Sequence, residues 1–192
     1  MILELNDLLI GGASHTYQAI CQGGSLTCLA EGSAELRTRL LLTILGLEPV
    51  KAGYITLDYE PLTLRSAVVL RRYMSYAPRN LETVGVVTPF EPPTVQEIFD
   101  LEANSDIAIS NGILAEEIRR ITGGSAESAE KHTGNCSPTS LAVASLLQRP
   151  LLLIDHPADY AVSYLQQKAR EGTTIIVSAS SQAYLDIADR VM

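Results

Sequence analysis

No stretch of this 192-residue sequence is apolar over a length that could cross a membrane. The longest apolar runs, residues 40–42 and 150–154, fall far short of the roughly 20 residues that a spanning helix needs. Residues 1–7 contain no basic region, and no signal-peptide cleavage site follows them. The sequence therefore predicts a protein without a secretion signal that resides in the cytoplasm, either free or peripheral to a membrane complex.

Positive charge is also scarce. The chain has 14 lysines and arginines against 22 aspartates and glutamates, which gives a net charge of −8. Because phosphate neutralisation needs a basic surface, this balance excludes a general nucleic-acid binder. The arginines gather locally, which is most simply a solvated face. They lie at Arg37 and Arg39, and again at Arg65, Arg71, Arg72 and Arg79.

Cysteine is rare, and its spacing does not suit a metal. The three cysteines, Cys21, Cys28 and Cys136, form no CxxC pair. Cys28 lies in an apolar strand pattern and is expected in the core. Without paired ligands nearby in sequence, neither a metal site nor a thiol nucleophile is predicted.

Apolar residues, by contrast, are abundant and periodic. Hydrophobic residues make up 46% of the chain and charged residues 19%, a composition typical of a globular protein. A length of 192 residues suits one domain with its own core. Alternating or apolar patterns predict strands at residues 3–10, 17–21, 25–30, 53–58, 71–77, 151–155 and 174–178. Helical spacing occurs at residues 36–45, 95–101, 113–121, 141–147 and 160–170.

The last strands indicate the fold class. Residues 151–155 and 174–178 are continuous apolar runs, which suit strands buried on both faces of a sheet. The helical segment between them completes a β-α-β unit, whose strands run parallel. The sequence therefore predicts an α/β protein with a mainly parallel sheet.

Taken in order, these segments resemble the ATPase domain of an ABC transporter over almost the whole chain. The resemblance is carried by GGSLTCLAEGSAELRTRLLLTILGLEPVKAGYITLDYEPLT, then LRRYMSYAPRN, SLLQRPLLLIDHP and EGTTIIVSAS. It implies a P-loop NTPase fold in three layers, with a small antiparallel β-subdomain and a shortened helical subdomain near residues 90–135. All of this would belong to a single domain, residues 1–192.

The phosphate-binding loop of that family reads G-x-x-x-x-G-K-[ST], and its glycines and lysine hold the phosphates. In this chain Glu31 replaces the first glycine, Leu36 the second, and the planar Arg37 the lysine. Glu31 and Glu35 are expected to face the helix N-terminus, where a phosphate would lie. The aligned residues are Glu31, Gly32, Ser33, Ala34, Glu35, Leu36, Arg37 and Thr38.

The other motifs of the family are altered as well. Arg79 stands at the Q-loop glutamine, and Ala179 replaces the switch histidine. At Walker B the Mg²⁺-associated Asp155 is retained, while His156 replaces the general-base glutamate. The signature segment aligns with His132, Thr133, Gly134, Asn135 and Cys136.

These replacements predict the loss of catalysis. Imidazole is a competent base near neutral pH, but His156 has nothing to activate without a bound phosphate and metal. Asp155 is interpreted as a structural carboxylate that accepts hydrogen bonds from the backbone or from Thr38. No catalytic residue, cofactor or metal is therefore assigned.

Three hypotheses remain open. The first is a non-catalytic ABC-ATPase-like protein that acts through protein contacts, with a membrane permease or an active ABC ATPase as partner and no direct membrane insertion. The second is a divergent ABC ATP-binding subunit that binds or weakly hydrolyses Mg·ATP. The third is a binder of an anionic small molecule that uses Arg37 and Arg79 in the former phosphate pocket.

Overall fold

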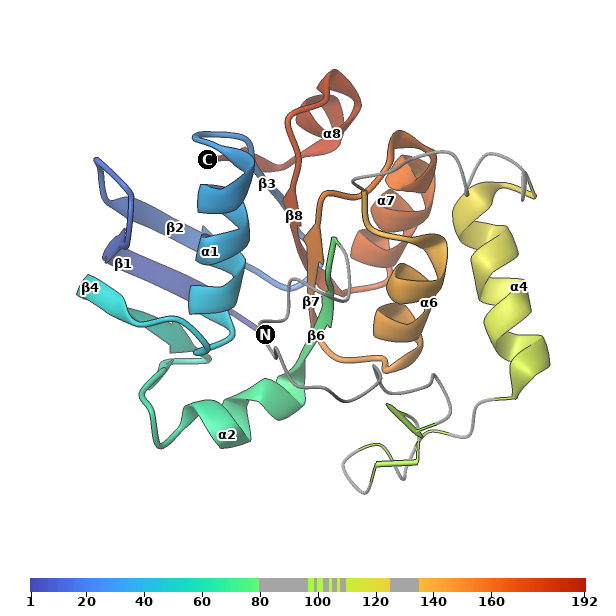
Figure 1. The fold of residues 1–192 in the computed structure, drawn as a ribbon, viewed down its shortest axis with the longest axis horizontal. Helices are drawn as coiled ribbons and strands as arrows, with labels where there is room; N and C mark the ends of the chain where they lie inside the picture. The colour runs from blue at the N-terminus through green and yellow to red at the C-terminus, as the bar shows by residue number, and fades with distance from the viewer. Residues whose placement is uncertain (80–96, 99, 102–103, 105–106, 108–109, 125–134) are drawn as a thin grey trace, which may run out of the picture.

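The computed structural model describes residues 1–79, 97–98, 100–101, 104, 107, 110–124 and 135–192. Within these residues the strands form two sheets. A four-stranded antiparallel sheet has the order β2-β1-β4-β5, and a five-stranded parallel sheet has the order β6-β7-β8-β3-β9. Figure 1 shows the two sheets with helix α1 between them.

Strands β1 and β2 of the antiparallel sheet alternate buried residues with more exposed ones, as predicted, whereas β4 has five exposed residues followed by three buried ones. In β1, Leu3, Leu5, Leu8 and Ile10 are buried. The register of β1 with β4 shifts after Asn6, and there a Cβ on Gly53 would lie 2.3 Å from the Asp7 carbonyl oxygen. Only glycine fits at that approach. The strands of this sheet are β1 (Leu3–Ile10), β2 (Tyr17–Cys21), β4 (Val50–Leu57) and β5 (Glu60–Pro61).

The parallel sheet forms the centre of the molecule, and every residue of β3, β7 and β8 is buried. Alternate residues of β7 face different cores. Leu151 and Leu153 pack with the antiparallel sheet and α1, while Leu152 and Ile154 pack with the helices on the far side. The strands are β3 (Leu26–Leu29), β6 (Met74–Ala77), β7 (Leu151–Asp155), β8 (Thr174–Ser178) and β9 (Arg190–Val191).

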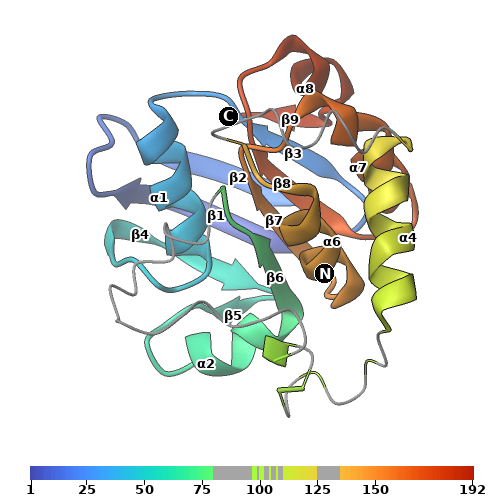
Figure 2. The ribbon, with the colours of Figure 1, turned by 45° about the vertical axis from the view of Figure 1, so that its right-hand side comes forward.

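Helices cover both faces of the parallel sheet. Helix α1 lies on one face, and α4, α6 and α7 lie on the other, as both views show (Figures 1 and 2). None of the helices in the described part of the chain is long and apolar enough to cross a membrane. The helices are α1 (Ala34–Ile44), α2 (Ala67–Leu70), α4 (Asn111–Thr122), α6 (Pro138–Leu146), α7 (Val162–Arg170) and α8 (Gln182–Ile187), with 3-10 turns η1 (Arg71–Tyr73) and η4 (Asp159–Ala161).

This architecture confirms the predicted α/β fold class, with its mainly parallel core sheet and its separate antiparallel sheet. Several local predictions were wrong at their N-terminal ends. The strand predicted for residues 53–58 and the helix predicted for residues 141–147 each start three residues earlier, as β4 and α6. The strand predicted for residues 71–77 starts only at Met74, after a 3-10 turn, and α7 is likewise preceded by a turn. Most of the helical subdomain predicted near residues 90–135 lies outside the described residues, although α4 falls within that range.

Candidate functional site

The loop between β3 and α1 meets the ends of β7 and β8 at the carboxyl edge of the parallel sheet. Ser33 caps α1, and its hydroxyl accepts a hydrogen bond from the Leu36 N–H at 3.2 Å. Gly32 has φ 76°, and a Cβ there would lie 2.7 Å from a methyl carbon of Leu36. The Leu36 side chain therefore lies directly over the loop.

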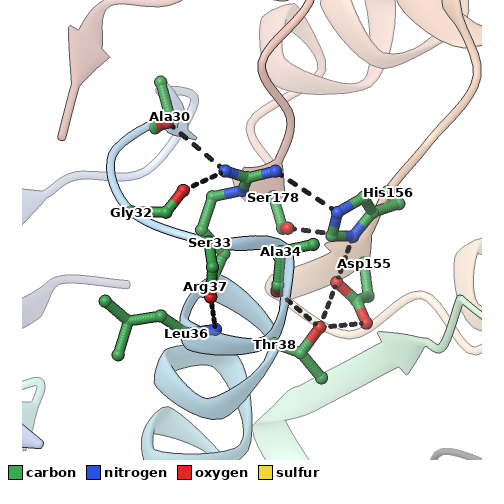
Figure 3. Close-up of polar contacts among 10 residues, drawn as sticks. All are labelled: Ala30, Gly32, Ser33, Ala34, Leu36, Arg37, Thr38, Asp155, His156 and Ser178. Atoms are coloured by element: carbon green, nitrogen blue, oxygen red, sulfur yellow. Dashed lines mark hydrogen bonds and ion pairs between the residues drawn. The ribbon is translucent and has the colours of Figure 1, made fainter. Parts of the chain in front are cut away.

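Arg37 fills the inside of this loop. Its Nη1 donates to the Gly32 carbonyl at 2.8 Å and to the Ala30 carbonyl at 3.4 Å, and the residue is only 7% exposed (Figure 3). A phosphate-binding loop directs its N–H groups inward toward an anion. Here a cation from the chain itself occupies the inside and binds the loop carbonyls instead.

His156 continues this chain of contacts. Its Nε2 lies 3.3 Å from Nη2 of Arg37. Because a guanidinium can only donate, Nε2 must accept and the imidazole proton must sit on Nδ1. That Nδ1 lies 2.8 Å from Oδ1 of Asp155. We therefore assign His156 as the neutral Nδ1-protonated tautomer, which links the arginine to the aspartate.

Asp155 is fully buried, and Thr38 lies against it. The Thr38 hydroxyl is 2.8 Å from Oδ2 and 3.0 Å from Oδ1 of Asp155, and 3.1 Å from the Ala34 carbonyl. A hydroxyl carries one proton, so these acceptors share it. The structural contact predicted for Asp155 is thus present. Across the described ranges, no group of three or more His, Cys, Asp or Glu side chains could hold a metal ion.

Ser178, His156 and Asp155 also approach one another, but they cannot act as a hydrolytic triad. The Ser178 hydroxyl lies 3.1 Å from Nδ1 of His156, the same nitrogen that contacts Asp155. A triad needs the serine and the carboxylate on opposite nitrogens of the ring, with an accessible serine. Here Ser178 is fully buried and Nε2 faces Arg37.

The sequence analysis missed the contact between Ser178 and His156. The sequence contained one usable signal. Residues 155 and 178 end adjacent parallel strands, and in the structure Asp155 pairs directly with Ser178. The position of Tyr76 near Asp155, on the neighbouring strand β6, was not predicted either. Burial, followed by the charge of Asp155, raises the pKa of the Tyr76 phenol.

Comparison with known structures identifies the fold. An ATP-binding subunit of an ABC transporter is similar to this chain at 20% identity and a TM-score of 0.67, over 100% of this chain and 86% of that one. A bacterial ABC transporter cassette solved as a dimer gives 15% identity and a TM-score of 0.67, over 100% and 93%. The chain has the fold of an ABC transporter ATP-binding subunit. A subunit of an ABC transporter complex from Clostridium perfringens gives 12% identity and a TM-score of 0.60, over 98% and 82%.

No family model matches the sequence, and no curated protein does either. At such low identity the structural likeness establishes the ABC ATPase fold, and the chemistry has to be judged from the residues themselves. The loop of residues 31–38, the end of β7 and the segment before α6 are the places where the sequence resemblance predicts the nucleotide-binding motifs.

The two glutamates of the loop differ in position. The expectation that Glu31 faces the helix N-terminus was wrong, because it lies in an exposed ion pair with His15 at 3.4 Å. Glu35, in contrast, lies in the first turn of the helix. Hydrogen bonds from its own N–H and from Ser33 lower the pKa of the Glu35 carboxyl, and the charge of Arg79 lowers it further.

The segment before α6 is hydrogen-bonded to the residue that follows β7. The Cys136 N–H donates to the His156 carbonyl at 2.8 Å, and burial raises the pKa of the Cys136 thiol to about 12. Ala179, in the switch position, is also buried, and its carbonyl accepts from Cys28 Sγ at 3.3 Å. Of the signature-like residues, His132, Thr133 and Gly134 lie outside the described residues, whereas Asn135 and Cys136 lie within them.

Proposed function

We propose that this chain is a non-catalytic protein of the ABC ATPase fold that acts through protein contacts. The observation that carries the proposal is the guanidinium of Arg37 inside the phosphate loop, where it binds the carbonyls of Ala30 and Gly32. ATP would have to expel this side chain and leave the two carbonyls without their donor. These two carbonyls therefore have a donor without a nucleotide.

The position of His156, which aligns with the general-base glutamate of the family, supports the same conclusion. His156 is held between Arg37 and Asp155, so its Nε2 lone pair points at a cation rather than at a water molecule. Phosphoryl transfer depends almost wholly on positioning and electrostatics, and one preorganised group is worth about 3 kcal/mol of barrier. Such contributions do not add, but the replacements at several positions of one site favour an inactive protein.

Calorimetric titration with Mg·ATP tests this proposal. We expect no binding tighter than about 1 mM, which corresponds to roughly −4 kcal/mol. The titration is repeated without Mg²⁺ and with Arg37→Ala, which empties the loop. Micromolar binding of Mg·ATP by the unchanged protein would contradict the proposal.

One observation favours a divergent ATP-binding subunit as the second candidate. Thr38 and Asp155, the hydroxyl and carboxylate that the family associates with Mg²⁺, are both present and lie in contact. The triple variant Glu31→Gly, Leu36→Gly, Arg37→Lys separates the candidates. We expect it to recover phosphate binding but not turnover, because Arg79, His156 and Ala179 remain. Hydrolysis well above background would favour the second candidate.

A third candidate, binding of an anionic small molecule, is not favoured. It requires the Arg37 guanidinium to be available, yet Nη1 and Nη2 are both engaged with protein atoms, and the Nε that has no partner among the described residues is buried. Titration with pyrophosphate tests it separately from ATP. Micromolar pyrophosphate binding that is lost in Arg37→Ala would restore this candidate.

We further propose that the partner is an active ABC ATPase or a membrane permease. Among the similar structures, one cassette is a dimer and another subunit is part of an ABC transporter complex. Without ATP as a bridge, a dimer of this chain would need direct contacts that bury on the order of 1,600 Å². Light scattering is expected to give the same mass with and without Mg·ATP. A dimer that forms only with the nucleotide would contradict this.

A further inference from the structure

The segment around helix α2 exposes the kind of side chain that a helix normally buries. Leu64 is 93% exposed, Val68 63% and Val69 56%. Ala67, Leu70 and Met74 on the same segment are buried. We call the outward set the α2 stripe. It consists of Leu64, Arg65, Val68, Val69, Arg72 and Tyr73.

The α2 stripe has helical spacing, because its members follow one another at intervals of one, three, one, three and one residues. A surface helix usually places polar residues on its outer face. Here the outer face carries four apolar or aromatic side chains and two arginines. The stripe is therefore amphipathic in the manner of segments that lie in a membrane interface, where basic and apolar residues occur together.

The segment is held in a defined conformation. The Thr63 N–H donates to the Ser66 hydroxyl at 2.8 Å, and the Ser66 N–H donates to the Thr63 hydroxyl at 3.1 Å. This reciprocal pair resembles the capping box that fixes helix starts. On the inner side, Nη1 of Arg71 donates to the Leu45 carbonyl at 3.3 Å. The outward residues are thus presented on a fixed support.

The charge of this segment is opposite to that of the chain. Residues 61–79 contain four arginines and no aspartate or glutamate, in a protein of net charge −8. Among the residues that the structure describes, neither Arg65 nor Arg72 forms an ion pair. The nearest acidic residues before the segment, Asp58 and Glu60, belong to the β4–β5 hairpin. A negatively charged partner is the complement of such a surface.

We propose that the α2 stripe docks on an anionic lipid surface. Four apolar side chains can enter the headgroup region while Arg65 and Arg72 meet the lipid phosphates. Stable protein interfaces involve roughly 20–30 residues on each side, far more than this stripe supplies. Peripheral binding to a membrane strengthens with the apolar area that enters it and with the attraction of basic residues to anionic lipids, and the stripe supplies both. The proposal does not depend on the phosphate loop.

Co-sedimentation of the full chain with phosphatidylserine–phosphatidylcholine vesicles tests this proposal. The protein should bind these vesicles and not pure phosphatidylcholine, and binding should weaken as salt rises. Each arginine is expected to contribute about fivefold to partitioning, so Arg65→Glu with Arg72→Glu should weaken binding at least tenfold. Leu64→Ser with Val68→Ser should also abolish most of it.

Matched controls lie elsewhere on the surface. Ile20→Ser removes an exposed apolar side chain of another sheet strand, and Arg170→Glu reverses an exposed arginine at the end of α7. Both should bind like the unchanged protein, and circular dichroism checks that every variant is folded. The proposal is overturned if the unchanged protein ignores anionic vesicles. It is equally overturned if the stripe variants bind the vesicles as well as the controls do. A stripe that binds an acidic protein but not the vesicles would overturn it too.

Discussion

The interior of the parallel sheet and its carboxyl edge differ in how they are stabilised. In the interior, every residue of β3, β7 and β8 is buried, and the contacts are apolar side chains on two faces. At the edge, Arg37, His156, Asp155 and Thr38 form a continuous chain of polar contacts, in which the buried Nε of Arg37 has no partner among the described residues. The interior is held by apolar packing, and the edge by polar contacts between side chains of the chain itself. The residues at the edge can therefore differ between proteins of this fold without a change in the apolar interior.

The largest expected loss of stability comes from a substitution in the interior of the parallel sheet. Leu153→Ala removes a fully buried side chain from the core shared with β1 and α1. We expect the free energy of unfolding to fall by about 2–5 kcal/mol, because a cavity remains in addition to the lost burial. Urea denaturation measures it. Leu64→Ala is the matched control, since Leu64 is 93% exposed and should change stability by less than about 0.5 kcal/mol.

The next largest loss of stability is expected from a substitution at the centre of the carboxyl edge. Asp155→Ala removes the buried acceptor that the Thr38 hydroxyl and the Nδ1–H of His156 share, and leaves them only the Ala34 carbonyl and the Ser178 hydroxyl. We expect the free energy of unfolding to fall by about 1–3 kcal/mol. Asp155→Asn retains an acceptor oxygen and should cost less, which urea denaturation of both variants can show. Equal losses in the two variants would mean that the hydrogen bonds do not stabilise the edge.

A smaller effect concerns the cap of α1. Ser33→Ala removes the hydroxyl that accepts the Leu36 N–H and should lower stability by about 1 kcal/mol. Ser180→Ala, in an exposed position after β8, is the matched control and should have almost no effect. Because α1 carries both Arg37 and Thr38, the measured loss shows how firmly the edge is held by its own helix. An unchanged stability for Ser33→Ala would mean that other contacts fix the loop.

The interior was much easier to predict from the sequence than the edge. Residues 151–155 and 174–178 are uninterrupted apolar runs, a pattern that is compatible with few local structures. Both are strands with the predicted bounds. The resemblance to the family also pointed to the loop of residues 31–38 and to Asp155, which lie in contact through Thr38. It could not show that Arg37 turns back onto the carbonyls of its own loop, because a side-chain direction follows from packing rather than from spacing.

The contact of Ser178 with His156 was missed for a related reason. It depends on the pairing of β7 with β8, which brings together residues 22 positions apart. Sequence patterns indicate that strands exist and run parallel, but they leave the register between neighbouring strands open. The start of β6 shows the same limit on a local scale, since Arg71–Tyr73 forms a 3-10 turn within an apparent strand pattern.

The smallest expected effect tests whether Glu31 or Arg37 would keep a phosphate out of the loop of residues 31–38. The sequence pointed to Glu31 as a negative charge in the anion site, but Glu31 and its partner His15 are 62% and 44% exposed. Such a pair contributes little, so Glu31→Gln should change the free energy of unfolding by less than about 0.5 kcal/mol. It should also leave Mg·ATP and pyrophosphate unbound in calorimetry, because Arg37 still fills the loop. If Glu31→Gln alone gave phosphate binding, the negative charge of Glu31, and not the Arg37 side chain inside the loop, would be what keeps phosphate out. The polar contacts of Arg37 at the edge would then not explain the absence of phosphate binding.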